Sequence, residues 1–207
     1  MPREDESPGH GPRRDEATSE TWYADRLAER EQVWWKRLLD VQRPYRWNLR
    51  RQHLGRTLDV GCGLGRNLKQ LPAGSVGVDH NAAAVAECRR RGLTAYTVEE
   101  WEARPDPDEQ FDAILLAHVL EHVTDPADLL ASYVPALRSG GTVFVICPQE
   151  RGYASDPTHV RFLDGPALQG IARDSGLVPD EWFSFPLPRW AGRAFTYNEF
   201  CLRASKP

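Results

Sequence analysis

Residues 58–68, LDVGCGLGRNL, place Asp59 and the glycines Gly61, Gly63 and Gly65 at alternate positions directly after a short apolar run. Glycine permits a positive φ angle and lets the backbone approach a ligand closely. A helix beginning near Arg66 would add free N–H groups and the positive end of a helix dipole. In a parallel α/β sheet, such a loop lies at the carboxyl end of a strand, where ligands bind. The pattern therefore predicts a loop that holds a small ligand.

A dinucleotide-binding loop is the competing interpretation. Its G-x-G-x-x-G fingerprint requires glycine where this chain has Arg66, and it has no acid at the position of Asp59. A nicotinamide-dependent oxidoreductase is therefore disfavoured.

The loop instead resembles motif I of class I S-adenosylmethionine-dependent methyltransferases, (D/E)-x-G-x-G-x-G, place for place. The resemblance covers about residues 55–207. The segment FDAILLAHVLEH, 111–122, is similar to the strand and E-H turn of small-molecule methyltransferases, including those that act on quinone precursors. The resemblance implies an α/β fold, with a Rossmann-like, doubly wound seven-stranded sheet whose last strand is antiparallel. It also implies S-adenosyl-L-methionine as the cofactor and transfer of its methyl group as the activity.

The resemblance implies that residues at the ends of successive strands contact the cofactor. Asp79 lies 18 residues after Gly61, where a carboxylate can accept hydrogen bonds from ribose hydroxyls, although it could instead cap the next helix. Glu100 and Trp101 are the choices for the adenine ring, and Glu99 competes because the register is uncertain by one residue. The expected cofactor-binding residues are Asp59, Gly61, Cys62, Gly63, Gly65, Asp79, His80, Glu100, Trp101, Ala117 and His118.

His118, Glu121 and His122 formally match the H-x-x-E-H pattern of zinc peptidases. That chemistry requires both histidines on one face of a helix, whereas these residues directly follow a predicted strand. A metallopeptidase is therefore disfavoured, and no metal site is expected.

Histidine can accept a proton from a hydroxyl group while its oxygen is methylated. His159, in a polar loop after the fifth strand, is the first choice for a general base, and His122 is the second. Glu121 or His122 could face the acceptor or only anchor the turn, and catalysis by positioning without a base also stays open. The expected substrate-binding residues from the same loop are Gln149, Arg151, Tyr153 and Arg161.

The secondary-structure elements that position the candidate site residues can be predicted from short apolar runs that alternate with helical patterns. This alternation predicts a parallel sheet with right-handed crossovers. Two strand-like runs near the end, without a helix between them, predict a hairpin and an antiparallel strand. The expected strands are 57–60, 76–79, 95–98, 113–117, 142–147, 182–187 and 196–204, and the expected helices are 66–71, 82–91, 126–137 and 166–175.

The chain before this domain divides into a charged tail over 1–18, expected to be disordered, and a helical cap or lid over 19–54. Helical spacing predicts one cap helix over about 19–40 and a second after Pro44. The catalytic domain is then 55–207. Aromatic residues of the cap could close over the ligand crevice or could simply pack: Trp22, Tyr23, Trp34, Trp35, Tyr45 and Trp47.

Composition bounds the function further. The 207 residues are 41% hydrophobic with a net charge of −4, which excludes wholesale disorder and a surface built entirely for nucleic acid. Four scattered cysteines, no signal peptide and no apolar run of membrane length predict a cytoplasmic protein. The expected partner is a small molecule, with an oxygen atom favoured as the methyl acceptor. A non-catalytic cofactor-binding scaffold and a nucleic-acid methylase are the alternatives, and the oligomeric state is not predicted.

Overall fold

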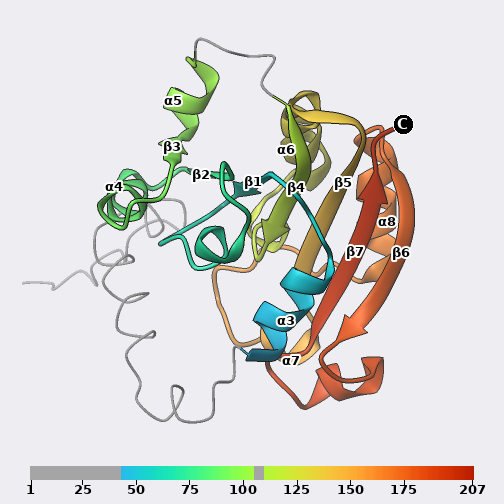
Figure 1. The fold of residues 1–207 in the computed structure, drawn as a ribbon. Coiled ribbons are helices and arrows are strands. Elements are labelled where there is room, and N and C mark those ends of the chain that lie inside the picture. Colours follow the sequence, from blue (N-terminus) through green and yellow to red (C-terminus); the bar gives the residue numbers. More distant parts are fainter. Residues whose placement is uncertain (1–42, 105–109) are drawn as a thin grey trace, which may run out of the picture.

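The computed structural model describes residues 43–104 and 110–207, so the expected tail over 1–18 and the cap helix over 19–40 lie outside the described residues. Its centre is a seven-stranded sheet in the order β3-β2-β1-β4-β5-β7-β6 (Figure 1). Neighbouring strands pair in parallel except β7, which is antiparallel to both β5 and β6. This confirms the predicted fold class. The strands are β1 Thr57–Val60, β2 Val76–Asp79, β3 Ala95–Thr97, β4 Phe111–Ala117, β5 Leu137–Pro148, β6 Val178–Phe185 and β7 Glu199–Ser205.

Side-chain caps define where several helices begin. Asn81 accepts hydrogen bonds from two backbone N–H groups of α4, and Asp164 accepts one from α8. None of the helices in the described part of the chain is long and apolar enough to cross a bilayer. The α-helices are α3 Arg43–Arg51, α4 Ala82–Arg90, α5 Val98–Glu102, α6 Pro126–Tyr133, α7 Glu150–Tyr153 and α8 Gly165–Asp174, and the 3-10 helices are η1 Leu68–Gln70, η2 Leu120–His122, η3 Val134–Ala136 and η4 Arg189–Arg193.

The helix expected over 66–71 is replaced by turns and the short η1, so this prediction was wrong. Gly65 has a φ of 76°, outside the helical region, and Pro72 follows only seven residues later. Because Pro72 lacks an N–H group, the interval offers too few hydrogen bonds to nucleate an α-helix. The helix expected over 126–137 likewise ends at Tyr133, just before Pro135.

The hydrophobic core occupies both faces of the sheet. On one face, side chains of β4 and β5 pack with those of α6 and α8, and Leu116 and Leu168 are fully buried there. On the other face, Leu49 of α3 packs with Leu115 and Phe144. Each such fully buried side chain contributes about 1.5–3 kcal/mol of stability. The segment before β1 is therefore part of the folded unit, and α3 packs next to the candidate site.

Candidate functional site

The loop after β1 adopts the conformation that its glycines predict. Gly61, Gly63 and Gly65 have φ angles of 71°, 52° and 76°. A Cβ atom on Gly61 would lie 2.4 Å from Val119, and one on Gly65 would lie 2.5 Å from Leu93. A Cβ atom on Gly63 would meet none of the described residues within 4 Å. The outer two glycines thus permit close packing of the loop, whereas Gly63 presents open backbone to a ligand.

Asp79 ends β2 beside this loop and is 8% exposed. Its Oδ2 atom accepts a hydrogen bond from the Gly63 N–H at 2.7 Å, and its Oδ1 atom accepts one from the Asn81 N–H at 2.9 Å. A carboxylate has about four acceptor sites, so both oxygens can still bind hydroxyl groups. The side chain of Asn81 caps α4, which leaves Asp79 available for a ligand. His80 is exposed next to it, with Nδ1 3.6 Å from Oδ1.

Asp59, in β1, is a buried carboxylate, and neither of its oxygens has a hydrogen-bond partner within the described residues. Burial raises its pKa to about 7, although the positive charge of Arg66 and the Leu68 N–H, which lies nearby but outside hydrogen-bond geometry, oppose that shift. Leaving such a group without a partner is costly, so buried carboxylates normally face a cation or a donor. Asp59 therefore provides an unfilled acceptor beneath the glycine loop.

The residues expected around the adenine ring have other contacts. Glu100 forms a capping box with Thr97 at the start of α5 and an ion pair with Arg89, with an N–O distance of 2.5 Å. Trp101 is 5% exposed and packs among core aromatic rings. Glu99 is exposed. A role for these residues in binding adenine stays a prediction.

Two further expected cofactor residues present mainly their backbone. Cys62, within the glycine loop, and Ala117, at the end of β4, are 6% and 7% exposed. The Cys62 thiol lies beneath the loop, 3.8 Å from the Gly63 carbonyl oxygen. A ligand in the crevice could meet the main chain at both positions.

His118 follows β4 in a left-handed conformation, with a φ of 61°, which is uncommon outside glycine although asparagine, aspartate and histidine adopt it more often than other residues. Its Nδ1 atom lies 3.2 Å from Glu121 Oε1, and its Nε2 atom lies 2.9 Å from Glu199 Oε1. Burial lowers the pKa of His118, but the two carboxylates outweigh this and raise it to about 9. At neutral pH the residue is therefore a cation that joins the end of β4 to β7. Such strain at a crevice is typical of functional sites.

The charge on His118 predicts a pH dependence of stability. Because its pKa of about 9 in the folded protein exceeds the ordinary value of 6.5, the stabilisation is complete below pH 6.5 and is lost as the pH rises through 9. His118→Asn keeps the left-handed backbone and removes the charge. We expect this variant to be less stable than the native protein below pH 6.5 by about 1–2 kcal/mol after solvent screening, and the gap to close by pH 10. Urea unfolding across this range measures the gap, and a constant gap would contradict the assignment.

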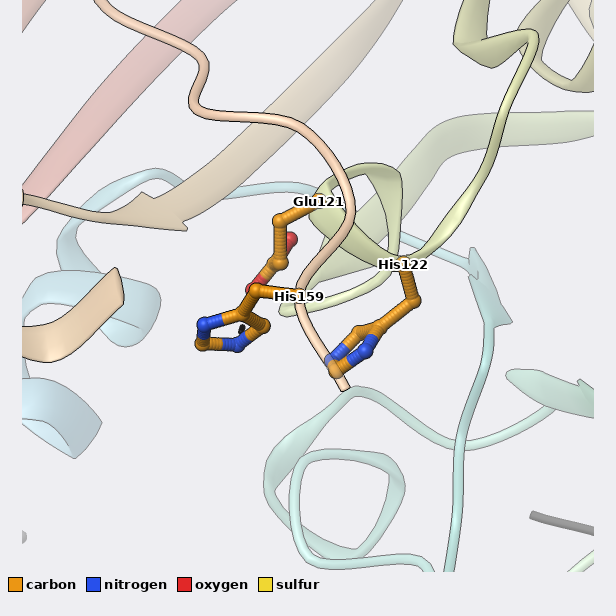
Figure 2. Close-up of side chains that lie close together, drawn as sticks. All are labelled: Glu121, His122 and His159. Atoms are coloured by element: carbon orange, nitrogen blue, oxygen red, sulfur yellow. Dashed lines mark ion pairs between the residues drawn. The ribbon is translucent and has the colours of Figure 1, made fainter. Parts of the chain in front are cut away.

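Glu121, His122 and His159 converge at the same end of the sheet, although 36 residues of sequence separate His122 from Thr158, the neighbour of His159 (Figure 2). Glu121 and His122 lie in η2, and His159 lies in the loop between α7 and α8. One potential ligand atom of each lies within 4.8 Å of the others. The N–H groups of Val160 and Arg161 donate to the Glu121 carbonyl oxygen at 2.9 and 3.2 Å, which fixes the loop over the turn.

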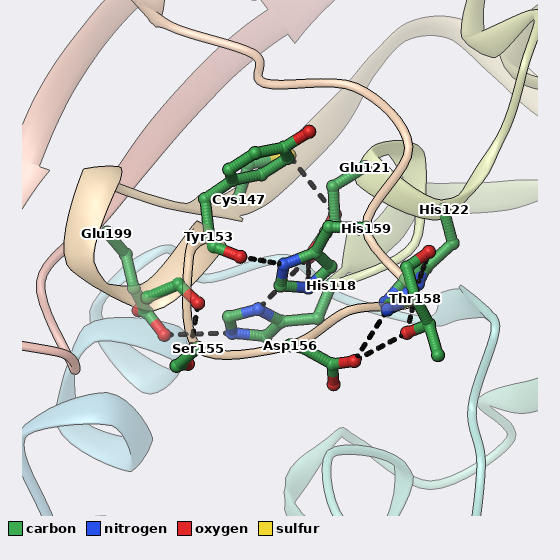
Figure 3. Close-up of polar contacts among 11 residues, drawn as sticks. His118, Glu121, His122, Cys147, Tyr153, Ser155, Asp156, Thr158, His159 and Glu199 are labelled. Atoms are coloured by element: carbon green, nitrogen blue, oxygen red, sulfur yellow. Dashed lines mark hydrogen bonds and ion pairs between the residues drawn. The ribbon is translucent and has the colours of Figure 1, made fainter.

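Hydrogen bonds determine which histidine nitrogens are available (Figure 3). Nδ1 of His159 lies 2.7 Å from the Tyr153 carbonyl oxygen and must donate to it, so in the neutral ring Nε2 carries the lone pair. Nδ1 of His122 similarly lies 3.3 Å from the Thr158 carbonyl oxygen. Burial lowers the pKa of His122, which keeps it neutral. Burial opposes ionisation of Glu121, but its pairing with cationic His118 outweighs this and lowers its pKa.

This cluster can therefore accept a proton at Nε2 of His159, next to a negative charge on Glu121 that would stabilise the resulting imidazolium. Two imidazoles and a carboxylate are also the ligand types of a catalytic divalent-metal site. The geometry of the three side chains permits either use. His118 takes no part in the metal-ligand arrangement because both of its ring nitrogens face carboxylates.

The expected substrate-binding residues differ in their availability. Gln149 is fully buried. Its amide donates hydrogen bonds to Ser184 of β6 and to the Glu199 carbonyl oxygen of β7, so its contacts are internal. Arg151 and Arg161 are exposed. Tyr153 stacks on His159, with ring centres 5.2 Å apart.

Comparisons with known proteins agree with this geometry. Residues 58–145 match the family model described as a methyltransferase domain. A ubiquinone biosynthesis O-methyltransferase from Methylococcus capsulatus is 37% identical over 98 residues, which cover 43% of this chain and 41% of that protein. The chain thus matches about two fifths of the length of this curated relative.

Solved structures show the same fold over more of the chain. A SAM-dependent methyltransferase from Archaeoglobus fulgidus has a TM-score of 0.62 at 19% identity and covers 78% of this chain and 93% of its own. A possible histamine N-methyltransferase from Thermotoga maritima has a TM-score of 0.61 at 20% identity. The match covers 90% of this chain and 99% of that protein. The chain therefore shares the fold of these S-adenosylmethionine-dependent methyltransferase structures, and residues 58–145 resemble a methyltransferase domain.

Proposed function

We propose that this protein binds S-adenosyl-L-methionine and transfers its methyl group to a hydroxyl oxygen of a small molecule. The observation that carries the proposal is the open backbone of Gly63 between two buried carboxylates, Asp59 and Asp79, at the carboxyl ends of β1 and β2. When bound, this cofactor supplies a sulfonium methyl group that is already activated. The unfilled acceptors of both carboxylates fit its ammonium and ribose hydroxyl groups.

The protein's main contribution is then to position the acceptor oxygen. Positioning alone can supply about 7–11 kcal/mol of the barrier reduction. His159 adds a proton acceptor at Nε2, held in that tautomer by the Tyr153 carbonyl oxygen. Glu121 lies 4.0 Å from this nitrogen, at Oε1, and would stabilise the protonated ring. General-base assistance of this kind is worth about 10²–10⁴ in rate.

An aromatic hydroxyl is the acceptor class that the site favours. The ring of Tyr153 stacks on His159, and the half-exposed ring of Phe162 meets Tyr153 edge-on, with ring centres 5.4 Å apart. These rings would form an apolar wall beside the proposed base, which suits a flat aromatic ring. The relative from Methylococcus capsulatus is a ubiquinone biosynthesis O-methyltransferase by name, which points to the same class.

The proposal is tested by calorimetric binding of S-adenosylhomocysteine and by its release from S-adenosylmethionine with a panel of catechols, phenols, sugars and oligonucleotides. Turnover with a phenolic acceptor supports the proposal. Cofactor binding without turnover on any acceptor favours the non-catalytic scaffold, and turnover on oligonucleotides favours a nucleic-acid methylase. Absence of cofactor binding overturns the proposal entirely. Repeating active assays with a chelator separates the general base from a metal at the Glu121 cluster, because only the metal would be removed.

Gly63→Ala provides a prediction about the glycine loop. Its added methyl group meets no protein atom, so the loss of stability should be limited to the cost of the positive φ, about 1–2 kcal/mol. The methyl group would, however, occupy the face that we assign to the cofactor, and we expect affinity for S-adenosylhomocysteine to fall at least tenfold. Gly92→Ala is the matched control because Gly92 has a φ of 76° and an equally open Cβ direction. Equal affinities of the two variants would contradict the assigned face.

A further inference from the structure

We propose that Tyr45 of α3 and Arg66 of the glycine loop bind the carboxylate of the amino-acid part of S-adenosylmethionine, opposite Asp59, which binds its ammonium group. The inference rests on the proposed function, since it assigns residues to one part of that ligand. It explains two side chains that the proposed methyl transfer leaves without a role. Arg66 is the residue that interrupts the dinucleotide fingerprint, and Tyr45 comes from outside the matched domain.

The first observation concerns the hydroxyl group of Tyr45. The Oη atom is buried and has no hydrogen-bond partner among the residues that the structure describes. Its ring stacks against His118, with ring centres 6.4 Å apart, so the side chain is held at the end of β4. A buried tyrosine hydroxyl normally has a partner. The vacant donor therefore points to a polar group that a ligand would provide.

The second observation concerns Arg66, which is half-buried beside Tyr45. Its guanidinium carbon lies 5.0 Å from the centre of the Tyr45 ring, an arrangement that orders both side chains. Arg66 is also close enough to Asp59 to affect that carboxylate electrostatically. The guanidinium thus contacts the aromatic ring and acts electrostatically on a carboxylate that has no hydrogen-bond partner among the described residues. A planar group with several donors is well suited to bind a carboxylate.

Together these side chains are complementary to a zwitterion. Asp59 offers only acceptors, whereas Tyr45 and Arg66 offer a neutral and a charged donor. An α-amino acid carries an ammonium and a carboxylate on the same carbon, so it can satisfy all three residues at once. Gly63, on the same loop, leaves open space for the remainder of the ligand. A single water molecule could not neutralise both the anionic and the cationic side chain.

The test compares ligands that differ only in this part. S-adenosylhomocysteine contains the amino acid, and 5′-deoxy-5′-methylthioadenosine lacks it but keeps the adenosine and the thioether. By calorimetry on the full chain, Arg66→Met should weaken binding of S-adenosylhomocysteine about tenfold or more and change binding of methylthioadenosine less than about twofold. Tyr45→Phe should weaken the former about fivefold, again selectively.

Decarboxylated S-adenosylmethionine identifies the group that Arg66 contacts. This ligand keeps the ammonium group, so the native protein and Arg66→Met should bind it equally, within about twofold. A second readout is thermal unfolding without ligand. Because Tyr45→Phe removes a hydroxyl group that has no partner among the described residues, its melting temperature should equal or exceed that of the native protein. A purely structural role for the hydroxyl would instead lower it.

Lys69→Met and Tyr197→Phe are the controls, since both residues are exposed and the substitutions likewise remove a cationic group and a phenolic hydroxyl group. Neither should change the affinity of either ligand. Equal weakening of both ligands by the Tyr45 and Arg66 variants, or no weakening of either, would overturn the inference while leaving the proposed function intact. If the native protein binds no S-adenosylhomocysteine, the proposed function itself fails.

Discussion

Asp79→Ala is expected to lower affinity for S-adenosylhomocysteine at least 100-fold. The substitution removes both acceptors that we assign to the ribose hydroxyls, and charge-assisted hydrogen bonds contribute about 1.5–3 kcal/mol each. It also removes the acceptor that holds the Gly63 N–H at 2.7 Å, so the loop loses its link to β2. Unlike the Tyr45 and Arg66 variants, this variant should weaken methylthioadenosine just as strongly, because the ribose is common to both ligands. Calorimetry with the two ligands measures the effect.

Asp125→Ala is a matched control for this prediction. Asp125 also accepts a backbone hydrogen bond at the start of a helix, α6, but lies outside the glycine loop. Its loss should lower stability by about 0.5–2 kcal/mol without a change in cofactor affinity. Undiminished binding by Asp79→Ala would remove the main support for the proposed cofactor site, whereas a loss confined to S-adenosylhomocysteine would move Asp79 away from the ribose.

The conformation of the glycine loop and the position of Asp79 beside it could be predicted from the sequence because both depend on local geometry. Alternate glycines after a short strand fix a loop with positive φ angles, and the distance to the end of the next strand locates Asp79. The sheet order follows from the same regular alternation, since right-handed crossovers leave few arrangements of consecutive strands.

The burial of individual side chains could not be predicted from the sequence patterns. The family resemblance points to Trp101 and the polar loop after the fifth strand points to Gln149, and both side chains are buried, in packing or in internal hydrogen bonds. Conversely, Tyr45 carried no motif, and its unpartnered hydroxyl is evident only once α3 is packed against the sheet. The one indication for Tyr45 in the sequence was its place among the aromatic residues of the cap, which could close over a ligand.

The acceptor side depends on a long-range contact. His159 reaches Glu121 because the loop after α7 folds back, and backbone hydrogen bonds to Glu121 hold it there. The spacing of these residues in the sequence does not indicate that the loop after α7 folds back onto Glu121. The sequence could therefore nominate His159 and His122 as bases but could not show that they share one carboxylate.

The second large effect is expected from His159→Ala, which should lower turnover about 10²–10⁴-fold on a phenolic acceptor. The variant removes the Nε2 acceptor next to Glu121 but leaves the glycine loop and Asp79 in place. Affinity for S-adenosylhomocysteine should therefore stay within about twofold of the native value, and the loss should appear in kcat rather than in cofactor binding. Initial rates at saturating cofactor, with calorimetry on the same preparations, measure both quantities.

Two comparisons make this result specific for a proton acceptor. His53→Asn, at an exposed histidine that lies outside the assigned site and has a positive φ that asparagine tolerates, also removes an imidazole, so it should retain its kcat. An acceptor whose hydroxyl group is already ionised at the assay pH needs no base, so His159→Ala should recover most of its rate on that acceptor relative to the native enzyme. If the variant lost equal rate on both acceptors, His159 would act by positioning alone. Unchanged turnover would exclude either role and leave alignment of the acceptor as the protein's contribution.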